Sequence, residues 1–314
     1  MNNLNISVVI PVYNSEKSLA ALIDEIIIKL KKKHDKYEII LIDDASTDKS
    51  WNIIKDCCAK NNSIKAIQLR KNSGQHNAIF AGLKYSLGNF IVTMDDDGQN
   101  SPDDIDLLVD EVKKGFDVAY GNYKIKKHNI FRRFGSYLNN LIASFLFNKP
   151  KNIVLTSFRA FHASIKNEIL KSRSHTIYLD GLIFSITKSI SNVYVDHKER
   201  KHGDSNYTFF KLLGLWSQMA TGFSILPLRI SSILGIVFSI LSFLVSIWII
   251  FLRPMTSELP VGWTSLIVVV IFFGGIQLLA LGLIGEYIGR SYLTINKTIQ
   301  YSEKNTLNIQ DKIN

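Results

Sequence analysis

Short apolar runs alternate with amphipathic segments over the first part of the chain, as far as Gly121. The apolar runs are rich in β-branched residues and are ISVVIP (6–11), YEIILID (37–43), IKAIQL (64–69), FIVTMD (90–95) and DVAYG (117–121). Between them, apolar residues recur at helical spacing from about Lys17 to Lys33 and from about Gln75 to Leu87. Buried strands that alternate with helices are typical of a mainly parallel sheet. The pattern therefore predicts an α/β fold with helices on both faces of such a sheet.

The pattern becomes less regular after Gly121. The segments SFRAF (157–161) and SNVYVDH (191–197) predict two further strands. Apolar residues then recur at helical spacing from Tyr207 to Phe223, with two large aromatic side chains in one stripe. Such a stripe suits a helix that lies in a membrane interface, although a buried core helix has the same pattern.

Two long apolar stretches follow, at residues 230–252 and 263–285. Each can cross about 30 Å of hydrocarbon as a helix, and a soluble core helix rarely runs so long without a charge. Basic residues flank the pair at Arg229 and Arg290, whereas the connection between the stretches holds one Arg and one Glu. By the positive-inside rule we expect a multi-pass protein of the inner (plasma) membrane with both termini in the cytoplasm.

These patterns divide the chain into four predicted parts. Residues 1–205 form a cytoplasmic α/β domain, residues 206–228 an interfacial amphipathic helix, residues 229–290 a two-helix transmembrane anchor, and residues 291–314 a cytoplasmic polar tail. The adjacent Cys57 and Cys58 cannot form an ordinary disulfide with each other, which suits a reducing compartment.

The formal net charge of +10 raises the question of nucleic-acid binding. The sequence has no basic helix with interleaved aromatic residues and no zinc-ligand spacing. Its basic residues gather near the apolar stretches, where anionic lipid headgroups are the natural partners. We therefore expect a lipid bilayer as a partner and no nucleic acid.

Acidic residues follow the predicted strands where ligands bind in a parallel sheet, beyond the carboxyl ends. The fourth strand leads into Asp95, Asp96 and Asp97. Side chains on a strand alternate faces, so we expect Asp95 and Asp97 to face one side and Asp96 the other. Two such carboxylates repel each other unless they bind a divalent cation, for which a diphosphate and water supply the remaining ligands. The sequence thus predicts Mg²⁺ or Mn²⁺ at Asp95 and Asp97, with a solvated acidic loop that caps the next helix as the alternative.

A second acidic pair, Asp43 and Asp44, ends the second strand. A carboxylate there can accept a hydrogen bond from a base or from ribose hydroxyls. The sequence contains neither Gly-x-Gly-x-x-Gly nor a Walker P-loop, so it predicts no ordinary dinucleotide fold and no P-loop NTPase. Acids and a metal would then hold the nucleotide, which points to a nucleotide-sugar enzyme.

Several longer motifs occur together, and their order along the chain is specific. They are SVVIPVYN, LIDDASTD, RKNSGQHNAIFAGL, MDDDGQNSP, ERKHGDSNY and, after the first apolar stretch, GLIGEYIGR. The set resembles the family 2 glycosyltransferases of GT-A fold, in the branch that makes polyprenyl-phosphate sugars. That branch includes bactoprenol glucosyltransferases, dolichyl-phosphate mannose synthases and undecaprenyl-phosphate aminoarabinose transferases. The resemblance extends from about Ile6 to Arg290 and implies a Rossmann-like GT-A catalytic domain.

The resemblance implies roles for individual residues. It implies nucleotide-sugar binding by Pro11, Tyr13, Asn14, Asp43, Asp44 and Gln75. Asp95 and Asp97 match the family's metal-binding Asp-x-Asp, and Gln99 matches the glutamine that follows it. Contacts to phosphate and acceptor are implied for Arg132, Arg133, Arg159, Arg200, Lys201, Ser205 and Tyr207. Among all of these, the expected catalytic residues are Asp95, Asp97, Gln99 and Arg200.

The sequence departs from the family pattern at four places. Asp96 stands where a small residue is common, Gly98 stands where an apolar residue is usual, and NSP (100–102) replaces a more common Asp/Asn-Pro-Pro. Tyr123 stands where many relatives carry Arg, which leaves phosphate contact there to Lys124, Lys126 or the Arg132–Arg133 pair. These departures bear on the donor sugar and leave the reaction class unchanged.

The implied reaction is direct attack by a lipid phosphate on the anomeric carbon, with inversion. A phosphate oxygen is already anionic at neutral pH, so the site needs charge stabilisation for the leaving nucleoside diphosphate more than a strong base. UDP-glucose is the first expected donor, with UDP-N-acetylglucosamine, UDP-galactose and modified sugars as alternatives. Undecaprenyl phosphate is the expected acceptor, and a homo-oligomer the expected assembly. A processive synthase is disfavoured because Gln-x-x-Arg-Trp is absent. Transfer to another glycan or glycolipid, and a non-catalytic membrane scaffold, remain as alternatives.

Overall fold

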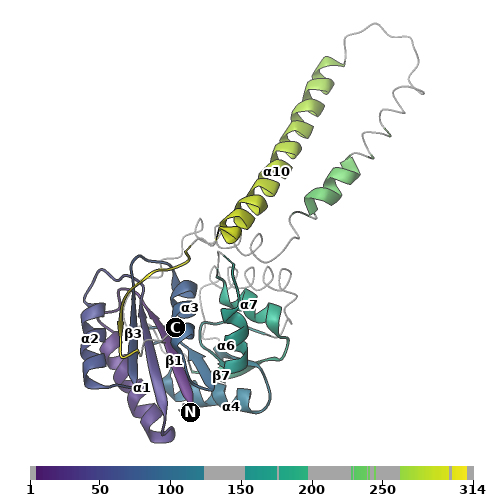
Figure 1. Cartoon of the computed structure of the whole chain (residues 1–314). Coiled ribbons are helices and arrows are strands. Elements are labelled where there is room, and N and C mark those ends of the chain that lie inside the picture. The colour runs from purple at the N-terminus through teal and green to yellow at the C-terminus, as the bar shows by residue number, and fades with distance from the viewer. Residues whose placement is uncertain are drawn as a thin grey trace. The chain divides into compact units, whose positions relative to one another are not determined.

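The computed structural model describes residues 5–123, 153–174, 177–196, 228, 230–238, 240, 244, 262–296 and 299–309 (Figure 1). They belong to two compact units. One unit comprises Met1–Phe209 together with Thr298–Asn314, and the other comprises Phe210–Lys297. The interfacial helix predicted at Tyr207–Phe223 lies outside the described residues.

The first unit is built on a single eight-stranded sheet with the order β7-β5-β6-β4-β1-β2-β3-β8. The strands are β1 Ile6–Val12, β2 Tyr37–Asp43, β3 Ile64–Leu69, β4 Phe90–Thr93, β5 Val118–Tyr123, β6 Arg159–His162, β7 Ile190–Val195 and β8 Glu303–Leu307. Four neighbouring pairs are parallel, and the pairs of β6 with β4 and β5 and of β8 with β3 are antiparallel. The predicted α/β fold with a mostly parallel sheet is confirmed.

Helices cover both faces of this sheet. They are α1 Leu19–Lys33, α2 Ser50–Lys60, α3 Gln75–Tyr85, the short 3₁₀ helix η1 Pro102–Asp104, α4 Ile105–Lys113, α6 Ala163–Leu170 and α7 Leu179–Ile186. Alternate side chains of a strand face opposite sides. Val8 of β1 accordingly packs in a core with α1, α2 and α4, whereas Val9 packs in a second core with α3, α6 and α7. All residues of β1 and β2 are buried, which explains their continuous apolar sequences.

The fourth strand is shorter than the sequence predicts, and this corrects the expectation for the aspartates. β4 ends at Thr93, so Asp95, Asp96 and Asp97 lie in the loop that follows it. The prediction that strand alternation sorts these three side chains is therefore wrong. The chain leaves the sheet here because Asp96 bonds to the loop after β1, where its carboxylate accepts from the backbone N–H of Tyr13 at 3.0 Å.

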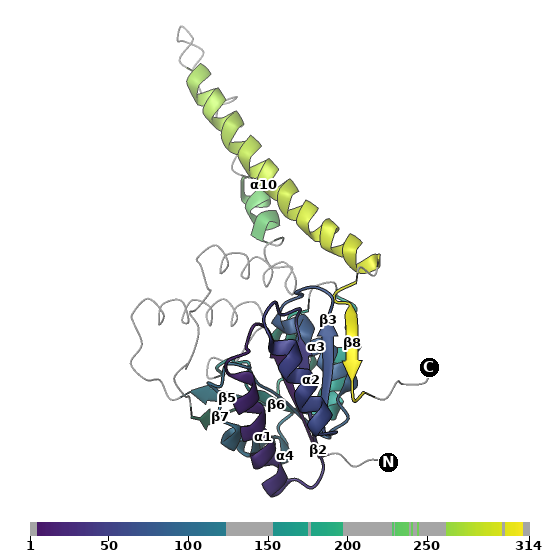
Figure 2. The same cartoon turned by 90° about the vertical axis from the view of Figure 1, so that its left-hand side faces the viewer.

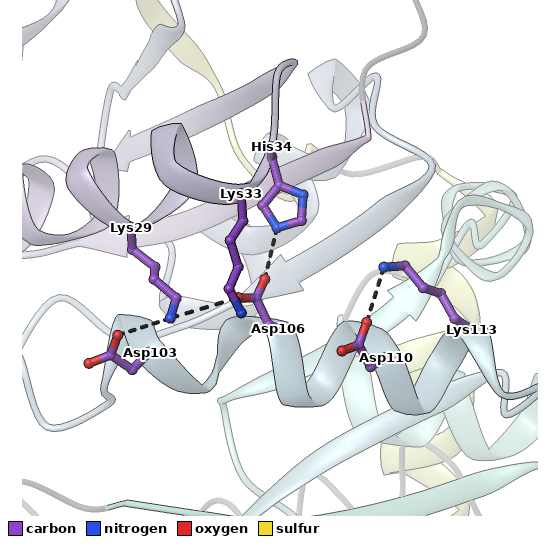
Figure 3. A network of polar contacts seen from close by, with 7 residues as sticks. All are labelled: Lys29, Lys33, His34, Asp103, Asp106, Asp110 and Lys113. Carbon is purple, nitrogen blue, oxygen red and sulfur yellow. Dashed lines mark hydrogen bonds and ion pairs between the residues drawn. The ribbon is translucent and has the colours of Figure 1, made fainter.

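The acids just after this loop have a separate, structural role. Asp103 pairs with Lys29 of α1 at 3.0 Å, and Asp106 of α4 pairs with Lys33 at 2.9 Å and with His34 at 2.8 Å (Figure 3). Lys33 and His34 hold the pKa of Asp106 below its ordinary value against the opposing effect of burial. These contacts join α1 to α4 and keep the second group of acids away from the strand ends.

The polar tail contributes a strand that the sequence did not predict. Glu303–Leu307 forms β8, which pairs with the edge strand β3 (Figure 2). Its sequence, EKNTL, is polar and lacks the alternation of a half-buried strand. The pairing therefore depends on the partner strand and could not be read from the tail alone.

The second unit contains one long helix, α10 Trp263–Ile295. Its segment Phe272–Ile295 is long and apolar enough to span a membrane, and it is the one helix of this kind within the described ranges. The first of the two predicted spans is described only at residues 230–238, 240 and 244, all of which are helical. A two-helix anchor therefore stays a prediction.

Helix α3 packs against the sheet through a glycine, and this contact predicts a measurable loss of stability. A Cβ at Gly82 would lie 2.6 Å from Ile42 Cδ1 and 2.7 Å from Val9 Cγ1. We expect Gly82→Ala to destabilise the protein by about 1–3 kcal/mol, because the Ile42 and Val9 side chains or α3 itself must shift to admit the methyl group. Thermal unfolding of the detergent-solubilised full chain, followed by circular dichroism, measures the effect.

The matched control is Lys84→Ala, on the solvent side of the same helix. The ion pair of Lys84 with Glu303 spans 3.3 Å between partly exposed groups and contributes little. Equal unfolding temperatures for Gly82→Ala and the unmodified protein would contradict the close packing of α3.

Candidate functional site

Four loops meet at the carboxyl ends of β1, β2, β3 and β4, and Asp96 connects two of them. Its carboxylate accepts hydrogen bonds from the Tyr13 backbone N–H and from the Ser15 hydroxyl. Its backbone carbonyl accepts from the Ser18 hydroxyl at 3.0 Å. Burial raises the pKa of Asp96, and the hydrogen bonds from Ser15 and Tyr13 oppose that rise. The residue that departs from the Asp-x-Asp pattern thus fastens the loop after β4 to the loop after β1.

Asp95 is held on both oxygens. Oδ1 accepts from Gln75 Nε2 at 2.6 Å, and Oδ2 accepts from the Ser157 hydroxyl. Thr93 fixes Ser157 in turn, because its hydroxyl donates to the Ser157 carbonyl at 2.7 Å. Burial raises the pKa of Asp95 to about 6, and the charges of Asp97 and Asp96 add to the rise. Gln75, predicted as a donor-binding residue, is thereby placed beside the acidic loop at the start of α3.

Asp97 completes the acidic loop. One of its oxygens accepts from the backbone N–H of Gln99 at 3.0 Å, which forms a tight turn that includes Gly98 at φ 72°. Burial raises the pKa values of Asp95 and of Tyr123 on β5, and the Asp97 charge adds to both rises. Tyr123 donates to the side chain of Asn100 at 2.7 Å.

The Asp95 and Asp97 carboxylates fit a hard divalent cation. Within the described part of the chain, no group of three His, Cys, Asp or Glu side chains surrounds a common point. A pair of carboxylates is nevertheless a sufficient protein contribution for Mg²⁺ or Mn²⁺ when water and substrate phosphates supply the other ligands. A cation would also offset both causes of the raised pKa of Asp95, which are mainly burial and then the charges of Asp97 and Asp96.

The loops after β1 and β2 bind each other through Asn14. Its Oδ1 accepts from the backbone N–H of Thr47 at 2.8 Å, and its own N–H donates to Ser46 Oγ at 3.0 Å. Asn14 has φ 54°, a left-handed conformation that asparagine tolerates better than most residues. Tyr13, the preceding residue, keeps 48% of its surface exposed. The predicted nucleoside-binding residues Tyr13 and Asn14 therefore lie in one ordered loop.

Pro11 is buried in β1, a central strand. The pairing of β1 with β4 ends at Val9 and Thr93, so Pro11 lies beyond the part of β4 that needs a backbone donor. This explains how a proline fits into an interior strand.

Asp43 and Asp44 are both buried, and each accepts hydrogen bonds from the backbone of a nearby loop. Asp44 accepts from the backbone N–H groups of Ser73 at 2.7 Å and Gly74 at 2.8 Å, just before α3. Burial raises the pKa of Asp44, and these two bonds oppose the rise. Asp43 accepts from Gln68 Nε2 at 3.2 Å and from the Ser46 N–H at 3.3 Å. The structure thus gives both acids a positioning role, and contact with a base stays a prediction.

Arg159, predicted as an acceptor-side residue, belongs to a buried polar group that the sequence does not predict. Arg159 on β6 pairs with Asp180 in the first turn of α7, and Tyr120 Oη donates to the same carboxylate at 2.8 Å. The Arg159 guanidinium also lies over the Tyr120 ring, 5.4 Å from its centre. Its charge lowers the pKa of Asp95 and so partly offsets the acidic cluster.

His76 of α3 belongs to the same buried region. Its Nδ1 accepts from the Leu179 N–H at 3.4 Å, and its ring packs edge-on against Tyr178 with centroids 4.9 Å apart. Burial lowers the pKa of His76 to about 4. Apart from Arg159, which the resemblance names for an acceptor contact, the sequence signal for this group was an acid, Asp180, within the apolar segment TIYLDGLIF.

The structure thus brings together most of the predicted donor and metal residues at one end of the sheet. These are Tyr13, Asn14, Asp43, Asp44, Gln75, Asp95, Asp97 and Gln99. Arg159 is 2% exposed and lies behind them, so its predicted acceptor contact stays a prediction. The remaining predicted residues, Arg132, Arg133, Arg200, Lys201, Ser205 and Tyr207, lie outside the described residues.

Comparison with known proteins connects this site to a family. Residues 7–173 match the model of Glycosyl transferase family 2. The undecaprenyl-phosphate 4-deoxy-4-formamido-L-arabinose transferase of Proteus mirabilis is 32% identical over 299 residues, which cover 94% of this chain and 92% of that protein. The transferase of the same name from Aeromonas hydrophila is 34% identical over 311 residues, covering 96% and 94%.

Solved structures support the fold. A glucosyl-3-phosphoglycerate synthase from Mycobacterium tuberculosis, in complex with Mn²⁺, UDP and phosphoglyceric acid, has a TM-score of 0.52 at 17% identity, covering 70% of this chain and 77% of that one. The same synthase with phosphoglyceric acid alone has a TM-score of 0.54 at 17% identity, covering 70% and 79%.

The family match covers more than half of the chain, and the curated relatives cover nearly all of it. The resemblance drawn from the motifs, including the polyprenyl-phosphate branch, is therefore confirmed. The chain belongs to glycosyl transferase family 2 and is an enzyme with the GT-A fold.

Proposed function

We propose that the protein transfers a sugar from a UDP-linked donor to a polyprenyl phosphate, such as undecaprenyl phosphate, at the cytoplasmic face of the plasma membrane. The observation that carries the proposal is the Asp95–Asp97 pair, held at the carboxyl end of the sheet by Gln75, Ser157 and the Asp96 loop. Relatives that cover over nine-tenths of the chain, and that by name act on undecaprenyl phosphate, support this acceptor.

Glucose is the first candidate for the sugar, on the sequence resemblance. The names of the relatives give 4-deoxy-4-formamido-L-arabinose, and this makes a modified pentose the second candidate. The two sugars differ in the polar groups around the ring. Contacts in the sugar pocket would therefore determine which donor binds, and the diphosphate site would be the same for both.

The acidic loop is suited to stabilising a charged leaving group. Asp95 and Asp97 would hold Mg²⁺ or Mn²⁺, and the bound ion supplies positive charge beside the diphosphate that departs. Gln75 and Ser157 keep Asp95 in one orientation, and Asp96 keeps the loop from moving toward solvent. The carboxylates are therefore preorganised, which is the condition for effective electrostatic stabilisation.

The neighbouring titratable groups are consistent with an acceptor that needs no strong base. His76 is buried with a pKa of about 4, so it is neutral at pH 7 and already accepts a backbone hydrogen bond. Asp180 is engaged by Arg159 and Tyr120. A polyprenyl phosphate brings its own anionic oxygen and can attack without help from either group.

The nucleoside half of the donor would lie against the loops after β1 and β2. Tyr13 offers an exposed aromatic ring, and Asn14 and Thr47 fix the backbone beside it. On the acceptor side we assign phosphate contacts to Arg132, Arg133, Arg200, Lys201, Ser205 and Tyr207. Anchoring by α10 would keep the enzyme beside a lipid-borne acceptor, and we propose a homo-oligomer.

A panel of labelled donors tests the proposal directly. Membranes that contain the protein are incubated with undecaprenyl phosphate and with UDP-glucose, UDP-N-acetylglucosamine, UDP-galactose or the UDP-linked formamidoarabinose. We expect label in the lipid fraction from one of these donors. A panel in which no donor labels the lipid, with or without Mn²⁺, contradicts the proposal and favours another acceptor or a non-catalytic scaffold.

Removing one carboxylate tests the metal assignment. We expect Asp97→Asn to reduce transfer by roughly 100-fold or more, because the loss of one anionic ligand weakens the cation that stabilises the leaving group. Transfer of labelled sugar into lipid by membranes with equal amounts of each protein measures the effect.

Asp103→Asn is the matched control. Asp103 is a largely exposed acid near the same loop, and its ion pair with Lys29 leads away from the site. We expect this variant to retain transfer, and wild-type turnover by Asp97→Asn would refute the metal assignment.

Metal removal gives an independent test. An excess of chelator should abolish transfer, and added Mn²⁺ or Mg²⁺ should restore it, because the protein offers two carboxylates that depend on the cation. Transfer that persists undiminished in the chelator would rule out a divalent metal at Asp95 and Asp97.

A further inference from the structure

The strand β8 belongs to the first unit and begins beside the carboxyl end of β3, the end of the sheet that holds the predicted donor site. Residues 296–302 alone separate it from the end of α10. It pairs antiparallel with β3, and Asn305 lies opposite Gln68 in that register (Figure 2). Gln68 in turn lies opposite Asp43 of β2. Three polar residues thus stand side by side across three adjacent strands.

These residues form a continuous ladder of hydrogen bonds. Asn305 Nδ2 donates to Gln68 Oε1 at 2.7 Å, and Gln68 Nε2 donates to Asp43 Oδ2 at 3.2 Å. Gln68 and Asp43 are buried, so the outer end of the ladder at Asn305 is its exposed part.

The direction of the ladder is determined by its inner end. An ionised carboxylate accepts hydrogen bonds and cannot donate them. Gln68 must therefore turn its NH₂ group toward Asp43, and this leaves its carbonyl oxygen facing β8. The residue on β8 must then be a donor, which Asn305 is.

The ladder continues into the predicted nucleotide site. The other oxygen of Asp43 accepts from the Ser46 N–H at 3.3 Å, and Ser46 Oγ accepts from the Asn14 N–H at 3.0 Å. Ala45, between Asp43 and Ser46, has φ 56°, a conformation that is costly for a residue with a Cβ. The turn therefore needs its anchors, and Asp43 is one of them.

We infer that Asn305 is a positioning residue for nucleotide binding, acting through Gln68 and Asp43 on the loops that contain Ser46 and Asn14. This inference rests on the proposed function, which makes those loops the nucleoside site. It assigns to the segment after α10 a role in the donor site that neither its polar sequence nor its distance along the chain would indicate.

A simpler role for β8 is to cover the edge of the sheet, and other contacts serve that role. Asn308 Nδ2 donates to the carbonyls of Cys58 and Ile64, both at 2.8 Å, and Tyr85 Oη donates to Glu303 at 2.6 Å. None of these contacts reaches Asp43. They offer a control that weakens the docking of β8 without touching the ladder.

The test compares variants of the full chain in detergent. Asn305→Asp has nearly the same shape but places an acceptor against the Gln68 carbonyl. Gln68 then loses its hydrogen bond to residue 305, or it turns its amide and loses its hydrogen bond to Asp43. Asn305→Ala removes the outer bond only. Asn308→Gly is the control, because glycine accepts the φ of 54° at that position.

Two readouts separate the inference from the proposed function. The first is amide hydrogen exchange of peptides that cover residues 12–18 and 43–49, without nucleotide. The second is the dissociation constant of UDP in the presence of Mn²⁺. We expect Asn305→Asp to accelerate exchange in both loops and to weaken UDP binding about fivefold, as the loss of one hydrogen bond does. Asn305→Ala should have a smaller effect, and Asn308→Gly should leave both loops and UDP binding unchanged.

Each outcome supports or overturns the inference. Wild-type exchange and UDP binding in Asn305→Asp would overturn it. Equal loosening of the loops by Asn308→Gly would also overturn it, because strand docking would then suffice. If the unmodified protein binds no UDP but Asn305→Asp still accelerates exchange in the two loops, the positioning role stands and the proposed donor fails.

Discussion

Three consecutive carboxylates after β4 repel one another, and hydrogen bonds from neighbouring loops fix their positions despite that repulsion. Asp96 is turned toward the Tyr13 N–H and the Ser15 hydroxyl, which removes it from the other two. Asp95 accepts hydrogen bonds from the side chains of Gln75 and Ser157, and the buried Arg159 adds an opposing charge behind it. Asp95 and Asp97 are then the two carboxylates of this loop that we assign to a divalent cation and the diphosphate of the donor.

Most of the frame that produces this arrangement could be predicted from the sequence. Buried runs such as ISVVIP and YEIILID read as parallel strands because both of their faces are covered, and strand ends with acids locate the site. The sorting of the aspartates could not be predicted in the same way. It depends on Asp96 leaving the sheet to meet a loop 83 residues earlier in the chain, and strand periodicity carries no information on such a bond.

Two other features could not be predicted from the sequence, for related reasons. The Arg159–Asp180 pair with Tyr120 and His76 draws on β6, α7, β5 and α3, so its members meet only through the tertiary fold. The strand β8 is polar throughout, and its strand character comes from β3. For the first feature the acid in TIYLDGLIF was a signal that a local pattern gives no reason to select, and for β8 the sequence EKNTL offered none.

The return of the chain to the sheet after α10 has a practical consequence. A shortened protein that stops before Phe210, as one would make to remove the long apolar helix α10, also lacks β8. Strand β3 would then present unpaired backbone groups along an open edge, the kind of surface on which sheets of separate molecules join. Aggregation of such a fragment would reflect a missing strand and would say little about whether the catalytic domain folds without a bilayer.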